Sequence, residues 1–166
     1  MKSAGKDQAP VRAAGGLVLR DCALVAIVQL RKNKTWVLPK GKLKAGEDPL
    51  AAAQREAREE TGHEVAVHEY LGEMASEPGA RPKIVQFWRM QAAGTPTGKL
   101  MRDVRKVKWL PLDHAIDTLS HANERTFLGH VGPAALQAAR QSAAGPGGGL
   151  IARIRAWLRL LRLPGL

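Results

Sequence analysis

The amino-acid sequence predicts a single domain of the α+β class. Segments typical of β-strands fill the first two-thirds of the chain, one well-delimited helix interrupts them, and further helices follow towards the end. This order differs from the regular strand–helix alternation of parallel α/β folds. A length of 166 residues is sufficient for one domain with its own hydrophobic core.

Apolar, β-like runs separated by polar turns open the chain. The expected strands cover residues 13–19, 23–30 and 36–38. Arg20 and Asp21 interrupt the first pair, and Pro39 ends the third strand because proline cannot donate a hydrogen bond to a neighbouring strand. Residues 40–47 carry two glycines and three lysines, so we expect a loop there.

The clearest helix lies between Asp48 and Gly62. Asp48 can accept hydrogen bonds from the first backbone N–H groups of a helix, and Pro49 suits its first turn. Residues 50–61 are rich in Ala, Glu, Arg and Gln, which favour helix. Gly62 stands where a residue in the left-handed conformation commonly ends a helix.

Strands and then helices follow this segment. The expected strands cover residues 64–71, 83–90 and 104–110, and the expected helices cover residues 112–119 and 123–142. Gly129, Gly132 and Pro133 lie within the last helix, and we expect them to break it.

Composition divides the chain into four parts. We expect a disordered leader over residues 1–10, the folded domain over 11–143, a Gly/Pro linker over 144–149 and a cationic tail over 150–166. The start lacks the apolar stretch of a signal peptide, and no run approaches the roughly 20 apolar residues that cross a bilayer. Cys22 is the only cysteine, which excludes a disulfide framework. A cytoplasmic protein is therefore expected.

The chain is strongly basic. It has 26 Lys and Arg residues against 15 Asp and Glu residues, a formal net charge of +11. Such an excess attracts anions, whether nucleic acid, an anionic membrane or a small polyphosphate. A solvated basic surface would give the same composition, so motifs must distinguish these partners.

One face of the central helix is acidic. Glu56, Glu59 and Glu60 stand at positions i, i+3 and i+4, so their side chains share a face, and Leu50, Ala53 and Ala57 form an apolar stripe beside it. Crowded carboxylates repel one another unless a cation lies among them, and carboxylate oxygens suit Mg²⁺ or Mn²⁺. The alternative is a solvated acidic face with Arg–Glu pairs along the helix.

The segment from Gly41 to His63 resembles the Nudix box, Gly-x5-Glu-x7-Arg-Glu-U-x-Glu-Glu-x-Gly-U, in which U is a bulky aliphatic residue. The residues on its fixed positions are Gly41, Glu47, Arg55, Glu56, Glu59, Glu60 and Gly62. Two residues depart from the pattern, since Ala57 is small and His63 replaces the last aliphatic residue. The resemblance extends over residues 11–130 and implies the Nudix fold, an α/β/α sandwich with a mixed β-sheet.

The resemblance also implies a chemistry, the attack of water on phosphorus in a diphosphate, with metal ions held by the box. The implied ligands of Mg²⁺ or Mn²⁺ are Glu56, Glu59, Glu60 and the backbone carbonyl of Lys40. Arg55 is implied to orient a glutamate, and Glu47 to hold the junction of loop and helix.

The acid that accepts the proton of the water varies within the Nudix family. Glu56 is the candidate inside the box. Asp103 resembles the acid that a later strand or loop supplies in some relatives. Alternatively, Asp103 pairs with a nearby basic residue.

The segment Trp36–Gly41 resembles that of diadenosine polyphosphate and diphosphoinositol polyphosphate hydrolases more than that of enzymes that remove oxidised nucleotides. Lys40, Lys42 and Lys83 are candidates for contacting phosphates. We expect a dinucleoside polyphosphate substrate. The alternatives are a diphosphoinositol polyphosphate, a nucleoside triphosphate, or a non-catalytic module that binds a nucleotide or RNA. Nucleic acid is not expected as the main partner, since no RNA-binding motif appears.

The tail has helical periodicity over residues 150–163. Leu150, Ile154 and Trp157 belong to one apolar side, while Arg155 and Arg159 share another. Such a cationic amphipathic helix suits an anionic membrane surface. Alternatively, it docks on its own domain or on a second subunit.

Overall fold

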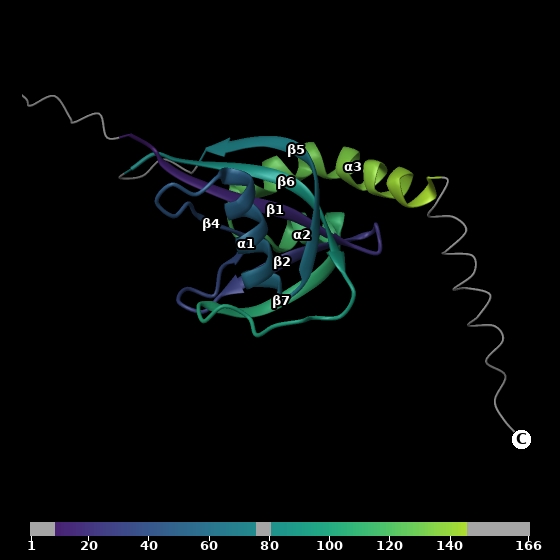
Figure 1. Ribbon diagram of the computed structural model, residues 1–166, viewed down its shortest axis with the longest axis horizontal. Coiled ribbons are helices and arrows are strands. Elements are labelled where there is room, and N and C mark those ends of the chain that lie inside the picture. The colour runs from purple at the N-terminus through teal and green to yellow at the C-terminus, as the bar shows by residue number, and fades with distance from the viewer. Residues whose placement is uncertain (1–8, 76–80, 146–166) are drawn as a thin grey trace, which may run out of the picture.

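The structure is a computed structural model that describes residues 9–75 and 81–145. A mixed sheet separates one helix on its near face in Figure 1 from two helices behind it. The elements are β1 (Val11–Arg20), β2 (Leu24–Leu30), β3 (Trp36–Val37), β4 (Lys40–Lys42), α1 (Pro49–Thr61), β5 (Glu64–Ala75), β6 (Lys83–Ala93), β7 (Val104–Pro111), α2 (Leu112–Thr118) and α3 (Ala122–Ala144).

Strand β1 is the centre of the sheet, whose strand order is β3-β2-β1-β6-β5. It runs parallel to β6 and antiparallel to both of its other neighbours. On that second side it forks, because residues 13–15 pair with β4 whereas Leu19 and Arg20 pair with β2. β7 lies against β2, outside this path. The fork places the segment between β3 and β4 beside the first half of β1.

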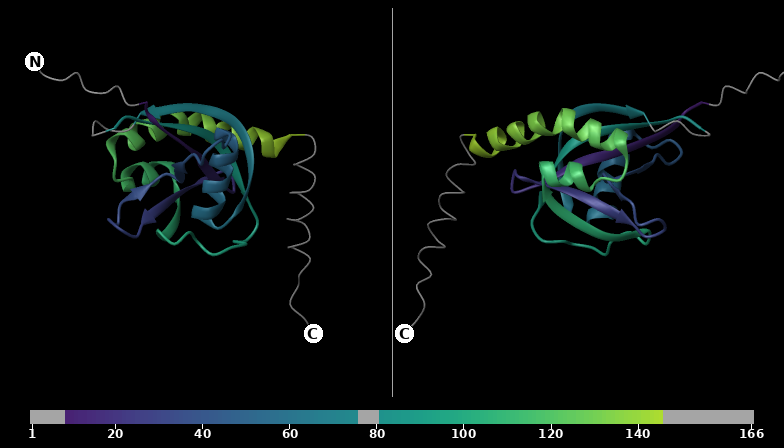
Figure 2. Two further views of the ribbon diagram at one scale, coloured as in Figure 1. Left: turned by 60° about the vertical axis from the view of Figure 1, so that its left-hand side comes forward. Right: turned by 180° about the vertical axis from the view of Figure 1, so that it is seen from behind.

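Side chains alternate along β1 and enter two hydrophobic cores on opposite faces of the sheet. Leu17 and Leu19 belong to the core that α2 and α3 cover, together with Leu128. Ala14 and Val18 belong to the core that α1 covers. The view from behind in Figure 2 shows α2 and α3 across the other face. The expected α+β class and α/β/α sandwich with a mixed sheet are confirmed.

Helix α1 begins and ends where its capping residues predict. The Asp48 carboxylate accepts hydrogen bonds from the N–H groups of Leu50 and Ala51 at 3.0 and 3.1 Å. Gly62 has a φ of 74° and its N–H donates to the carbonyl of Arg58. The expected apolar stripe is correct for Ala53 and Ala57 and wrong for Leu50, because Ala52 faces the sheet and Leu50 is 40 % exposed.

Three expectations about the remaining elements were wrong. Residues 40–42 form strand β4 instead of a loop, since pairing with β1 overrides their weak strand preference. Strand β5 extends past Leu71 because its pairing with β6 continues to Ala75. Helix α3 runs unbroken through Gly132 and Pro133. Gly132 lies against the end of the Leu112 side chain of α2, where a Cβ atom would collide, so the glycine that was expected to interrupt the helix lets the two helices pack closely.

Parts of the expected domain organisation lie outside the described residues. Ala144, expected to begin the linker, is the last residue of α3. Nearly all of the leader, most of the linker and the whole amphipathic tail over 150–163 lie outside the described ranges. Within those ranges, no helix is long and apolar enough to span a membrane.

Candidate functional site

The candidate site forms where the acidic face of α1 meets the segment between β3 and β4. Glu56 and Glu60 are buried, with 6 % and 4 % of their surface exposed, and Glu59 lies at the rim. The alanines of α1 that pack on the sheet bring this face inward. Glu56 and Glu60 are thus not solvated, in contrast to the alternative interpretation, whereas Glu59 is partly exposed.

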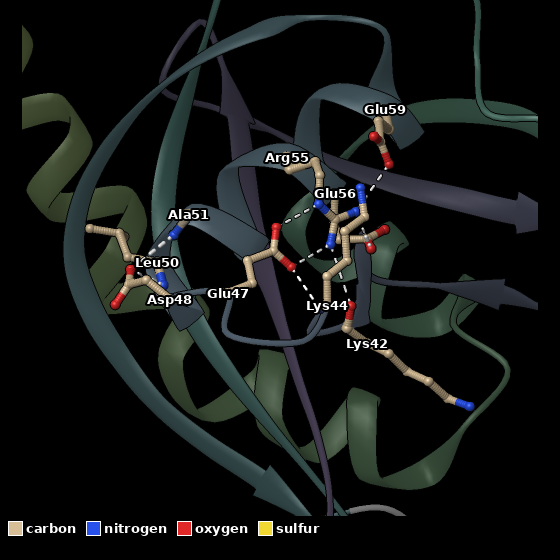
Figure 3. Close-up of polar contacts among 9 residues, drawn as sticks. All are labelled: Lys42, Lys44, Glu47, Asp48, Leu50, Ala51, Arg55, Glu56 and Glu59. Carbon is tan, nitrogen blue, oxygen red and sulfur yellow. Dashed lines mark hydrogen bonds and ion pairs between the residues drawn. The ribbon is translucent and has the colours of Figure 1, made fainter.

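Arg55 connects the loop before α1 to the acids on it. Its guanidinium donates to both carboxylate oxygens of Glu47, at 2.7 and 2.9 Å. Its Nη1 atom also donates to Glu56 at 2.7 Å and to Glu59 at 3.2 Å. Figure 3 shows this guanidinium between Glu47 and the two acids. The arginine therefore contacts the carboxylates of all three residues at once.

Glu47 and Arg55 also contact the backbone of the loop before α1. Glu47 accepts the backbone N–H of Lys44 at 2.8 Å, while Arg55 Nη2 donates to the carbonyl of Lys42 at 3.3 Å. The hydrogen bonds from Arg55 and Lys44 lower the pKa of Glu47 to about 2. This carboxylate is thus a charged support of the loop.

Gly41 lies very close to one of the acids of α1. A Cβ atom at this position would overlap the carboxylate of Glu56. Gly15 of β1 is similarly restricted, because a Cβ there would overlap the carbonyl of Pro39. The glycine at position 41 lets the β4 backbone lie close to Glu56, and the glycine at position 15 lets β1 lie close to Pro39.

Glu60 is the most deeply buried of the three acids on α1. The backbone N–H of Lys40 donates to its carboxylate at 2.9 Å. Burial nevertheless raises the pKa of Glu60 to about 8. Burial also raises the pKa of Glu56, although hydrogen bonding and charge from Arg55 oppose the shift. A nearby cation would favour the charged form of both carboxylates.

The three lysines expected to contact phosphates have different surroundings. The Lys40 ammonium lies 2.6 Å from Glu124 of α3, so its charge is already paired. Lys42 is exposed. Lys83 is partly buried, and its pKa is lowered by burial and then by the charges of Lys40 and Lys42. Such a positive environment attracts anions.

A pocket of about 320 Å³ lies on the side of the sheet that α3 covers. Its walls include Met74 and Val85, and its polar groups include Lys40, Lys83 and Glu124. Lys40 thus joins this pocket to the acidic face, since its side chain lines one and its backbone N–H contacts the other.

Glu124 was not anticipated from the sequence. It is 2 % exposed, and its carboxylate accepts the N–H of Leu38 at 2.7 Å besides pairing with Lys40. It lies 64 residues beyond the last acid of the box, and no local pattern distinguishes it from an ordinary acid in the first turn of a helix. Only the folded chain brings it to the site.

Asp103 lies in the turn before β7, and it is exposed. Its backbone carbonyl accepts the N–H of Arg31 at 2.7 Å. Its carboxylate is near enough for its charge to raise the pKa of Glu60 slightly, after burial and other influences. His63, which replaces the last aliphatic residue of the box, is buried and packs edge-on against Trp109.

The donor set suits a hard divalent cation. Its oxygens belong to carboxylates, and burial penalises the negative charge of two of them. Within the described ranges, no three Asp, Glu, His or Cys side chains are already gathered around one metal position. Arg55 is shared between Glu56 and Glu59, so a cation would join an existing positive group there.

Comparison with known proteins identifies the family. The family model described as the NUDIX domain matches residues 9–130. The chain belongs to the NUDIX family. Nudix hydrolases generally use divalent metals.

Relatives of this Nudix chain have different named substrates. An 8-oxo-(d)GTP phosphatase of Mycolicibacterium smegmatis is 33 % identical over 74 % of this chain and 42 % of its own length. The asymmetrical bis(5'-nucleosyl)-tetraphosphatase of Caenorhabditis elegans is 29 % identical over 71 % of this chain and 91 % of its own length. The chain spans 42 % of the length of the M. smegmatis phosphatase and 50 % of that of a putative mutator protein MutT4 of Mycobacterium tuberculosis.

Solved structures agree on the fold. A binary complex of a C. elegans Ap4A hydrolase has a TM-score of 0.64 and 27 % identity, covering 72 % of this chain and 93 % of that chain. A MutT protein from Methanosarcina mazei has a TM-score of 0.67 at 19 % identity, covering 76 % of this chain and 96 % of that chain. The similarity to the M. mazei protein supports the fold alone.

Proposed function

We propose that this Nudix chain hydrolyses a phosphoanhydride bond of a dinucleoside polyphosphate with the help of Mg²⁺. The observation that carries the proposal is the acidic face of α1, where Arg55 and the Lys40 N–H hold three glutamates beside Gly41. These are the box residues of a family of hydrolases.

The residues that would hold the metal are Glu56, Glu59, Glu60 and the backbone carbonyl of Lys40. Bound there, Mg²⁺ supplies Lewis-acid chemistry, activating water and neutralising the charge of phosphate oxygens. Arg55 orients Glu56 and Glu59, and Glu47 orients Arg55. The glycine at position 41 leaves room for the Glu56 carboxylate.

Glu56 accepts the proton of the attacking water in this proposal. Arg55 donates to its Oε1 atom, and we assign the proton to Oε2. A carboxylate whose pKa is raised by burial is a better base than an exposed one. Asp103 is the second candidate for this proton, because its carboxylate is near Glu60 and is exposed.

Two observations support a dinucleoside polyphosphate. The C. elegans tetraphosphatase aligns over 91 % of its length, so its similarity covers nearly a whole protein. Lys42 and Lys83 also provide positive charge near the acids, which suits an extended phosphate chain. We place the part of the substrate beyond the cleaved bond in the pocket lined by Lys40 and Lys83.

The second candidate substrate is 8-oxo-(d)GTP. The M. smegmatis phosphatase with this name has the higher identity, 33 %, although the match spans 42 % of that protein. Other nucleoside triphosphates, diphosphoinositol polyphosphates and a purely binding role complete the alternatives. The full set of box acids disfavours a purely binding role.

A substrate comparison tests the proposal. The purified chain is incubated with Mg²⁺ and equal concentrations of Ap4A, 8-oxo-dGTP, dGTP and a diphosphoinositol polyphosphate, with EDTA controls. We expect cleavage of Ap4A with the highest kcat/KM and its loss with EDTA. Preferential cleavage of 8-oxo-dGTP would reassign the substrate, and Ap4A binding without cleavage of any compound would overturn the enzymatic proposal.

A further inference from the structure

The segment from β3 to β4 is held between two helices on opposite faces of the sheet. On one side, the Lys40 N–H donates to Glu60 of α1 at 2.9 Å. On the other, the Leu38 N–H donates to Glu124 of α3 at 2.7 Å. Figures 1 and 2 show α1 and α3 on the two faces that this segment connects.

The side chain of Lys40 strengthens this connection. Its ammonium lies 2.6 Å from Glu124 and also donates to the carbonyl of Leu38 at 3.3 Å. Both partners of the ion pair are largely shielded, with 13 % and 3 % of their side chains exposed. A charge-assisted pair in such surroundings is stronger and more directional than one in water.

The segment has little freedom to move elsewhere. The carbonyl of Pro39 accepts the N–H of Gly16 at 3.0 Å, and the N–H of Trp36 donates to Ser120 at 2.9 Å. Displacing Leu38 and Lys40 would therefore carry the Lys40 backbone away from Glu60. Glu60 on α1 and Glu124 on α3 therefore contact the same short segment, which β1 also holds.

We propose that Glu124 is a positioning residue, which holds Leu38 and Lys40 so that the Lys40 backbone and Glu60 are set for binding the metal. The inference rests on the proposed function of the acidic face. Glu124 acts from α3 through Lys40 and contacts neither the box acids nor, in this scheme, the phosphorus. Mutation of groups that support metal ligands in this manner typically lowers metal affinity or activity by ~10- to 100-fold.

Glu124→Gln is the main test variant. The glutamine keeps an oxygen that can accept the Leu38 N–H, and it removes the charge that pairs with Lys40. Glu69→Gln is the matched control, because Glu69 also forms a 2.7 Å ion pair with a buried cation, Arg89, on β5 and β6. Circular dichroism and thermal unfolding establish that each variant is folded.

Two measurements follow on the folded variants. Calorimetric titration with Mn²⁺ alone is expected to show affinity ~10-fold or more lower for Glu124→Gln and nearly unchanged for Glu69→Gln. Hydrolysis of Ap4A at saturating Mg²⁺ is expected to show kcat falling by a similar factor while KM changes little. Equal Mn²⁺ affinity in the wild type and in Glu124→Gln would overturn the positioning role.

A double variant covers the case in which the unpaired Lys40 prevents Glu124→Gln from folding. Lys40→Met/Glu124→Gln removes both charges, a replacement that folded proteins commonly tolerate. Its Mn²⁺ affinity should be ~10-fold or more below that of the wild type, because the contact between Lys40 and Glu124 is lost in it as well. Wild-type affinity in the folded double variant would contradict the proposal.

The two proposals fail in different ways. A wild-type chain that binds Mn²⁺ and cleaves none of the compounds removes the proposed enzymatic function, and the Mn²⁺ titration still tests Glu124. A wild-type chain that binds no Mn²⁺ at millimolar concentration overturns both.

Discussion

The guanidinium of Arg55 forms a bidentate hydrogen bond with the carboxylate of Glu47, with Nε 2.7 Å from one oxygen and Nη2 2.9 Å from the other. The same group donates to Glu56 and Glu59 from its remaining nitrogen. A residue of the loop therefore sets the plane of the arginine, and the arginine sets the acids of α1.

Arg55→Lys should lower activity without unfolding the chain. Lysine keeps the charge but cannot reproduce the planar fork that reaches Glu47 and Glu56 together. We expect kcat with Mg²⁺ to fall by ~10- to 100-fold, as for other groups that orient metal ligands. Arg58→Lys is the control, because Arg58 pairs with Glu64 at the exposed surface of α1. Equal kcat in the two variants would show that the fork is dispensable.

Acid stability should depend on Glu47. Its pKa is lowered from 4.5 to about 2 by Arg55 and the Lys44 N–H, so folding favours its charged form. Its stabilising contribution is therefore complete above pH 4.5 and is lost as the pH falls towards 2. Thermal unfolding of the wild type and Glu47→Gln should show a Tm difference at pH 7 that shrinks on acidification. A constant difference from pH 7 down to about pH 2.5 would count against this assignment.

Gly41→Ala should disturb the site from the backbone side. The added methyl group overlaps the Glu56 carboxylate, so either this side chain or the backbone must move. Since Glu56 is a proposed metal ligand and base, we expect hydrolysis of Ap4A to fall by ~10-fold or more. Gly98→Ala is the matched control, because no atom lies within 4 Å of the added Cβ at that position. Comparable activity in both variants would show that the close approach of Gly41 to Glu56 is not needed for hydrolysis.

Local signals in the sequence predicted helix α1 well. Asp48, Pro49 and Gly62 each act through neighbours within four residues, so the sequence alone defines both ends of the helix. The spacing of the box acids likewise needs only helical geometry. These signals suffice to predict the acidic face of α1 and the class of the fold.

Contacts between distant residues set the features that the sequence did not predict. β4 forms by pairing with the first half of β1, and α3 runs unbroken through Gly132, which packs closely on Leu112. Glu124 lies 64 residues after Glu60, and the contact between α3 and the β3–β4 segment alone gives it a role. Such information is absent from any local pattern.

Mg²⁺-dependent turnover of Glu59→Gln and Glu60→Gln tests the central claim most directly. Glutamine preserves the shape of each side chain, and at position 60 it keeps an oxygen for the Lys40 N–H, so both variants should fold like the wild type. Because metal-based stabilisation of the transition state amounts to several kcal/mol, we expect turnover of Ap4A to fall by ~100-fold or more in each. Hydrolysis at the wild-type rate in both folded variants would contradict the assignment of these glutamates to the metal.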